Sequence, residues 1–557
     1  MRRGPLVCAV LTAILTVVVT WPLFAAPASR VLDAGSIYGG AASLVQRDIN
    51  LTMWVLAWDC HALATSPATL FDANAFYPAR MSLALSEHML GNVPLFAPAY
   101  AATANAVLAH QIALLATFVI AAMTMRAYVF HWTRDEVAAL AAGLVYAFAP
   151  FRLWQVGNLH VISIHALPLV PLGIDLALDG RRRAGGAMLV TGLVVSALCS
   201  YYVGYAAFAL AGGYGLVRVL ARRDRGGVVA IALGGGVAAA VVALLTVPYL
   251  MLQREGIIPA RSQESGFVSL AFIGVLREGP IGIASFFLWR RRDGVPLFLG
   301  FTATALAIAG VIGHRRAPRG ALVAAALTGY VLALGPNYLR HDGTLVALPY
   351  RWLVSLVPGF SAMRVPQRFG SITTWAAVAL AGLGIAWLRT TLRARGRSRL
   401  ATAIPVLVVL AAMVEGWPGR VGTLAMPAGP TMPPAAVWLA THGEGGAMIE
   451  LPIAAKDLLG QSLAVYRSTA HWLPIANGYA PYVPDSFRRI MEAAERLPSA
   501  AALDEMLGVA PFRWIVVRRA ALARGMLPEW ERTFAARGLR AAADFGDAAV
   551  YEVSPKD

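Results

Sequence analysis

Carboxylate and imidazole side chains gather in one long polar segment, residues 26–106, of a chain that is otherwise largely apolar. Apolar residues follow Asp48 at the spacing of one helix face: Leu51, Trp54, Val55 and Trp58. This spacing predicts an amphipathic helix over 48–61 that lies at a membrane surface. A carboxylate held there could take a proton from a hydroxyl group as a general base. The alternative for Asp48 is a carboxylate near a helix N-terminus, which the helix macrodipole favours.

A second carboxylate on the same predicted helix, Asp59, points in nearly the same direction as Asp48. The two are within ~20° of each other around an ideal helix, but ~16 Å apart along its axis. Carboxylates at that separation cannot act on one atom as a pair. Only one of them can be the reactive carboxylate, and we expect Asp48 rather than Asp59 to be the base.

Later in the polar segment, Glu87 stands next to His88 in the string Ser86-Glu87-His88. Such a pair can support acid–base chemistry or hold a divalent ion, although adjacent side chains on a helix diverge by ~100°. The alternative makes Ser86 the N-cap of a helix. We expect Glu87 and His88 to assist Asp48 in catalysis.

Two arginines, Arg364 and Arg368, precede the apolar run that begins near residue 370. Four residues apart, they would share one face of a helix, and their guanidinium groups could grip a phosphate bidentately. The alternative is that both side chains reach toward lipid headgroups.

Further polar groups lie between apolar runs and in the C-terminal part of the chain. Arg152 and His160 are polar groups near the predicted membrane edge, although a lone histidine is more often structural. His471 and Trp472 could line a carbohydrate groove, an interpretation that packing of a small domain explains equally well. No phosphate-binding loop, zinc spacing or nucleophile elbow is present in the sequence.

The composition predicts the elements that must position these residues. The chain has 557 residues, of which 58% are hydrophobic and 14% charged, and its mean hydropathy is +0.62. Several apolar runs are long enough to cross a hydrocarbon layer of ~30 Å as helices. We expect a polytopic α-helical membrane protein with about eleven spans, near 7–25, 107–128, 135–151, 161–178, 186–202, 204–220, 228–251, 294–313, 320–335, 370–388 and 399–416.

The net charge of +17 follows from arginine clusters between the apolar runs. Such clusters mark cytoplasmic loops and explain the charge without nucleic acid. They place the N-terminus inside, and they place the polar segment 26–106 and everything after Glu415 outside. One cluster, Arg290 to Arg292, falls on the outer side against this rule, either as a patch facing a lipid phosphate or as an interfacial helix end.

Two domains are expected: a transmembrane domain over 1–417, and a small extracytoplasmic α/β domain over 418–557, where short strand-like and helix-like runs alternate. The first apolar run is expected to be a retained helix, with a cleaved signal peptide as the rival interpretation. Cys8, Cys60 and Cys199 form neither a metal spacing nor a disulfide framework.

One span, a large outer loop with an early Asp, many further spans and a C-terminal outer domain together resemble the GT-C superfamily of integral membrane glycosyltransferases. Particular strings resemble a bacterial group within it: Asp48 to Trp58, Phe76-Tyr77-Pro78, Ser86-Glu87-His88, Pro358-Gly359-Phe360, Arg364-Val365-Pro366, His471-Trp472 and Asn477-Gly478-Tyr479. Many members carry a second acidic residue beside the first, whereas this chain has Asp48-Ile49-Asn50.

The resemblance implies an enzyme of the bacterial inner membrane. It would move a sugar from a polyprenyl-phosphate carrier in the lipid bilayer to a glycan, lipid or protein acceptor outside the cytoplasm. Asp48 would deprotonate the acceptor, Arg364 or Arg368 would stabilise the departing phosphate, and Glu87 and His88 would orient the acceptor or a metal ion. Arg152 would join the phosphate-binding arginines, and the residues that would contact the acceptor or the sugar are Asp59, His160, His471 and Trp472. Mg²⁺ or Mn²⁺ is the candidate cofactor, with unknown ligands.

Two other functions stay open on the sequence. A transporter or lipid flippase would place ionisable residues face to face at mid-membrane, and the predicted spans hold almost none. A non-catalytic scaffold with the same fold would leave the polar side chains dispersed rather than gathered in one cavity.

Overall fold

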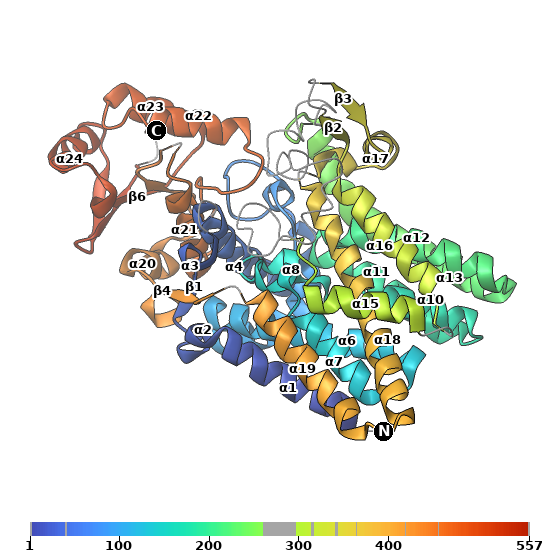
Figure 1. Cartoon of the computed structure of the whole chain (residues 1–557). Helices are drawn as coiled ribbons and strands as arrows, with labels where there is room; N and C mark the ends of the chain where they lie inside the picture. The colour runs from blue at the N-terminus through green and yellow to red at the C-terminus, as the bar shows by residue number, and fades with distance from the viewer. Residues whose placement is uncertain are drawn as a thin grey trace.

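The structure, a computed structural model, describes residues 3–38, 42–259, 297–313, 317–339, 344–363, 365–417, 419–454 and 456–554. Long apolar helices pack side by side, and the C-terminal elements lie together beyond one end of them (Figure 1). The arginine cluster 290–292 and the expected phosphate ligand Arg364 lie outside the described residues.

Eight helical stretches of the described residues are long and apolar enough to cross a membrane. They comprise α6 (Ala106–Thr133), α7 with α8 (Glu136–Ala147, Pro150–Leu153), α9 with α10 (Leu159–Ile162, Leu169–Leu178), α11 (Arg182–Cys199), α12 (Tyr201–Arg222), α13 (Arg225–Arg254), α18 (Gly370–Ala394) and α19 (Ser398–Gly416). The shorter apolar helices α1 (Arg3–Val19), α15 (Phe301–Gly313) and α16 (Arg319–Ala333) fall on the remaining expected spans. The chain is thus a multi-pass helical protein, and the number of helices that cross stays a prediction.

The polar segment 26–106 is folded and packs against these helices. Its elements are β1 (Arg30–Asp33), α3 (Gly35–Tyr38), α4 (Ala42–Thr65) and α5 (Val93–Thr103), and α2 (Trp21–Ala25) leads into it. The predicted helix exists as α4, but its expected place at a membrane surface is wrong. Every residue from Ile49 to Asp59 is buried, because other elements cover α4 on all sides at this level.

The C-terminal segment contains a four-stranded mixed sheet in the order β5-β6-β8-β7. Its strands are β5 (Met448–Leu451), β6 (Trp514–Arg518), β7 (Arg540–Asp544) and β8 (Ala548–Glu552), and only β5 and β6 run parallel. The helices are α20 (Pro434–His442), α21 (Leu458–Arg467), α22 (Asp485–Ala494), α23 (Ala500–Val509) and α24 (Leu527–Ala536).

The C-terminal segment and the polar segment share one hydrophobic core. β4 (Gly422–Ala425) pairs antiparallel with β1, and α21 packs against α4, as Figure 1 also shows. The two segments, far apart in the chain, therefore hold each other in place.

Between α16 and α18 the chain forms the hairpin β2–β3 (Asn337–Leu339, Leu345–Ala347) and α17 (Tyr350–Leu356). A 3₁₀ turn over Pro366–Phe369 then leads directly into α18. Proline suits the first position of such a turn because its missing N–H would have no partner there. The turn places Arg368 just before the N-terminal end of the long buried helix α18.

Candidate active-site cavity

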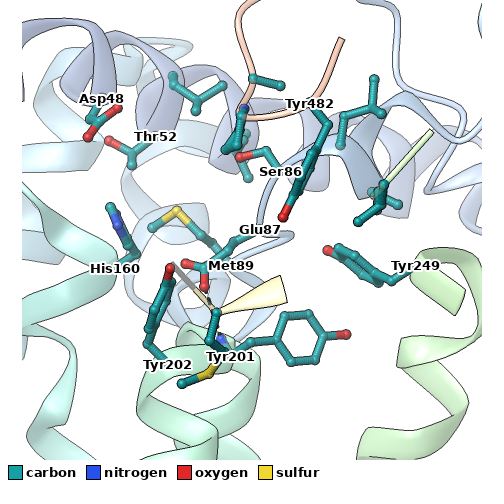
Figure 2. Close-up of a pocket in the computed structure, with 18 of the residues that line it drawn as sticks. Asp48, Thr52, Ser86, Glu87, Met89, His160, Tyr201, Tyr202, Tyr249 and Tyr482 are labelled. Atoms are coloured by element: carbon teal, nitrogen blue, oxygen red, sulfur yellow. Dashed lines mark hydrogen bonds between the residues drawn. The ribbon is translucent and has the colours of Figure 1, made fainter. Parts of the chain in front are cut away.

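A cavity of about 400 Å³ lies where the polar segment, the apolar helices and the C-terminal segment meet. This volume is in the ~300–1,000 Å³ range typical of small-molecule sites. Figure 2 shows Asp48 and Thr52 on its upper wall, Tyr201 and Tyr202 on its lower wall, and Glu87 between them.

Asp48 faces the cavity from α4. The residues of α4 that line the cavity recur at helical spacing: Leu44, Arg47, Asp48, Leu51, Thr52 and Val55. One face of a helix therefore presents this carboxylate, because residues three and four apart lie above one another. The Tyr479 hydroxyl, from the C-terminal segment, donates a hydrogen bond to Asp48 Oδ1 at 3.0 Å.

The side chain of Glu87, which comes from the polar segment, lies against the N-terminal end of α12. Its Oε1 accepts hydrogen bonds from Ser200 Oγ (2.8 Å) and from the Tyr201 N–H (3.2 Å). A helix N-terminus leaves its first N–H groups unpaired and carries a partial positive charge, so it suits a carboxylate. Burial raises the pKa of Glu87, although the nearby Arg368 guanidinium opposes this shift.

Arg368 supplies a cation to the cavity wall from the turn before α18. Its guanidinium carbon lies 4.2 Å from the centre of the Tyr202 ring, a cation–π contact that holds the group over α12. His160, from α9, lines the same cavity, and Figure 2 places it on the side of Asp48. Four expected site residues, Asp48, Glu87, His160 and Arg368, thus meet although they are far apart in the sequence.

No protein-family model and no curated protein sequence matches the chain. Among solved structures, it resembles that of the arabinofuranosyltransferase AftD from Mycobacteria with a TM-score of 0.61 and 17% identity. The chain has the GT-C fold. It is covered completely by this match and spans 42% of the AftD chain. The structure of apo ArnT from Cupriavidus metallidurans gives a TM-score of 0.44 and 12% identity, over 97% of each chain.

Within this GT-C fold, His88 and Arg152 do not line the cavity. Burial lowers the pKa of His88 to about 4, and its Nδ1 accepts a hydrogen bond from the Leu90 N–H at 3.2 Å. The Arg152 guanidinium is fully buried and donates to the carbonyl oxygens of Ile162 and Ala147 and to Thr117 Oγ1. Because these bonds join neighbouring helices, Arg152 stabilises the bundle and is not available to a phosphate in the cavity.

His471 and Trp472 also lie outside the cavity wall of the GT-C fold. Trp472 stacks on His61 of α4, with ring centres 4.4 Å apart and planes 14° apart. His471 Nδ1 accepts a hydrogen bond from the Leu473 N–H at 3.0 Å, and burial lowers the pKa of His471 to about 4. Trp472 thus helps to dock the C-terminal segment on α4, whereas the bond of His471 stays within its own segment.

Asp59 is fully buried behind the cavity, and neither carboxyl oxygen has a hydrogen-bond partner among the described residues. Burial raises its pKa well above the usual range, which favours the protonated form of this group in the folded protein. The unfolded chain releases that proton above pH ~4. Asp59 therefore lowers the stability of the fold progressively as the pH rises from this value toward the folded-state pKa.

Replacing Asp59 by Asn should raise the unfolding temperature at pH 7, because the uncharged amide loses no proton on unfolding. Each pH unit between the two pKa values costs the wild type about 1.4 kcal/mol. The difference between variant and wild type should shrink as the pH falls toward 4. Thermal unfolding of both proteins across this range measures it, and a constant difference would contradict the assignment.

The residues that sequence reasoning largely missed are tyrosines. Six of them line the cavity: Tyr201, Tyr202, Tyr205, Tyr249, Tyr479 and Tyr482. The string Tyr201-Tyr202 at the beginning of an apolar run was a usable signal, since hydroxyl-bearing rings suit the boundary between an apolar and a wet region.

The described residues form no group of three or more His, Cys, Asp or Glu side chains that could hold a metal ion. The carboxylates of Asp48 and Glu87 come from different walls, and one oxygen of each already accepts hydrogen bonds, from Tyr479 and from the start of α12. The described cavity residues therefore do not supply a ligand set for the candidate Mg²⁺ or Mn²⁺ ion.

Proposed function

We propose that the protein is a membrane glycosyltransferase that moves a sugar from a polyprenyl-phosphate donor to an acceptor hydroxyl outside the cytoplasm. One observation carries this proposal: a carboxylate, Asp48, and a guanidinium group, Arg368, line a single cavity of a GT-C fold. The polar segment and the C-terminal segment form one part of the wall, and the apolar helices α12 and α13 form another. A donor with a lipid tail and a polar head needs such a boundary.

In the proposed reaction Asp48 accepts the proton of the acceptor hydroxyl as its oxygen bonds to C1 of the sugar. The bond from C1 to the phosphate oxygen breaks on the opposite face, and the polyprenyl phosphate leaves with the electron pair. Arg368 stabilises the charge that builds on that phosphate, since a guanidinium group matches two phosphate oxygens at once.

The remaining cavity residues support binding in this proposal. Glu87 and His160 offer hydrogen-bonding groups to the sugar or the acceptor, and the tyrosines offer ring faces against which a sugar ring can stack. His88, Arg152, Asp59, His471 and Trp472 take no part in the proposed chemistry, because none of them lines the cavity.

The test is incubation of the purified protein with a panel of polyprenyl-phosphate sugars and extracted envelope glycans, lipids and proteins as acceptors. We expect one donor to yield free polyprenyl phosphate and a glycosylated acceptor in equal amounts. Movement of labelled lipid between leaflets of a vesicle, without release of polyprenyl phosphate, would instead favour the flippase.

One observation bears on that alternative. Asp175 of α10 and Arg218 of α12 form a buried ion pair within the apolar helices, at 2.6 Å. Tyr214 and Trp132 donate further hydrogen bonds to the same carboxylate. Both members of the pair lie within about one turn of the ends of their helices, at the end opposite the cavity residues Tyr201 and Tyr202. The pair therefore joins helix ends rather than lining a path across the middle.

A further inference from the structure

We infer that the C-terminal segment completes the active site, and that Tyr479 is a positioning residue for Asp48. This inference rests on the proposed function, because it assigns a role toward the proposed base. The loop of residues 474–482 follows α21 in the chain. Its residues Tyr479 to Tyr482 line the cavity.

The beginning of this loop is held between two other segments by backbone hydrogen bonds. On one side, Met448 of β5 donates to the Pro474 carbonyl at 2.8 Å, and Ala476 donates back to Met448 at 2.9 Å. On the other side, the polar segment 26–106 supplies three more backbone bonds, at 2.7–3.1 Å: Ile475 N–H to Asn74 O, Tyr77 N–H to Ile475 O and Phe76 N–H to Asn477 O. The loop is thus paired along both edges, like an inner strand.

Asn477 fixes the next position of the loop. Its side chain is buried and makes three hydrogen bonds: Oδ1 accepts from the Glu450 N–H (2.7 Å), and Nδ2 donates to the Glu450 carbonyl (2.9 Å) and to Gln461 Oε1 (3.0 Å). The backbone of Gly478 packs directly against the Phe76 ring, and a β-carbon at this position would overlap the ring. The backbone that carries Tyr479 therefore cannot shift without breaking several buried contacts.

From this fixed backbone Tyr479 reaches α4. Its hydroxyl donates to Asp48 Oδ1 at 3.0 Å, and the guanidinium carbon of Arg47 lies 5.6 Å from the centre of its ring. Farther along α4, Asn50 Nδ2 donates to Ser462 Oγ of α21 at 3.0 Å, so the helix and the C-terminal segment are tied at two levels. Tyr479 is the residue that carries this connection to the proposed base.

A hydrogen bond from a phenol to a carboxylate does two things for a general base. It selects one orientation of the carboxylate, which a proton transfer over hydrogen-bond distance requires. It also stabilises the ionised form, which is the form that accepts a proton. The charged or titratable groups that face the same cavity are Arg47 of α4, Glu87, His160 of α9, Arg368 before α18 and the tyrosines Tyr201, Tyr202, Tyr205, Tyr249 and Tyr482. All of these stay in place when only the phenol oxygen is removed.

The experiment compares the pH–rate profiles of the full-length wild type and the Tyr479→Phe variant in sugar transfer from the polyprenyl-phosphate sugar that the panel experiment selects. We expect kcat to fall about tenfold with the donor KM within about twofold, because a hydrogen bond to a charged group is lost and no donor contact changes. We also expect the acid limb of the profile to move up by about one pH unit, since the ionised base is less stabilised.

Tyr466→Phe is the matched control, because Tyr466 is in the same segment and its hydroxyl donates to the Pro427 carbonyl at 2.8 Å without lining the cavity. Its acid limb should stay where the wild type has it. A loss of rate in Tyr479→Phe with an unmoved acid limb, or no loss at all, would overturn the positioning role while wild-type transfer still upheld the proposed function. Absence of transfer in the wild type would instead overturn the function itself.

Discussion

Replacing Asp48 by Asn should slow sugar transfer by about 10²–10⁴-fold, the contribution typical of a positioned general base. The amide keeps the size of the side chain and can still meet the Tyr479 hydroxyl, so the shape of the cavity is preserved. It cannot accept the proton of the acceptor hydroxyl at neutral pH. Donor binding should change little, because Asp48 makes none of the proposed contacts to the donor. Initial rates over a range of donor concentrations separate kcat from KM.

The Asp59→Asn variant is the matched control for this prediction. It makes the same chemical change on the same helix, eleven residues farther along, at a carboxyl group that does not line the cavity. Its kcat should stay within about twofold of the wild type, since no contact to the reacting groups is altered. Equal losses in both variants would mean that α4 is sensitive to substitution in general, and Asp48 would lose its assignment as the base.

Replacing Arg368 by Ala should lower kcat by about 10²–10³-fold, the range seen when one donor to a developing negative charge is removed. The guanidinium is held over the Tyr202 ring close to Glu87, so it is oriented before the donor arrives. Arg368→Lys should recover only part of the activity, because an ammonium group keeps the charge but not the planar fork that matches two phosphate oxygens.

Arg254→Ala tests whether this effect belongs to the cavity or to positive charge in general. Arg254 is exposed at the end of α13, next to the cavity residue Gln253, but it does not line the cavity itself. Its removal should leave kcat unchanged. If the Arg254 variant lost as much activity as the Arg368 variant, the role of arginine would be attraction of an anionic donor rather than stabilisation of the departing phosphate.

Local patterns in the sequence predicted the elements well. The apolar runs coincide with helices because length and hydropathy are properties of a contiguous stretch. The helix after Asp48 and the strands β5, β6 and β8 were likewise readable from short-range spacing. The burial of α4 could not be predicted from local spacing. The C-terminal segment, some 400 residues later, covers the faces that the amphipathic pattern assigned to water and membrane.

The sequence by itself determined that this is a polytopic helical protein with a large polar segment near its start, and it narrowed the candidate base and phosphate ligands to a few residues. Only the tertiary structure decided which of them face one cavity. The cavity is lined by Asp48, Glu87, His160 and Arg368. Arg152 and His88 do not line it and form hydrogen bonds with backbone groups elsewhere. The physical reason is that the direction of a side chain is set by the phase of its helix and by the elements that cover it. For Asp48 the decisive partner, Tyr479, lies 431 residues away in the chain.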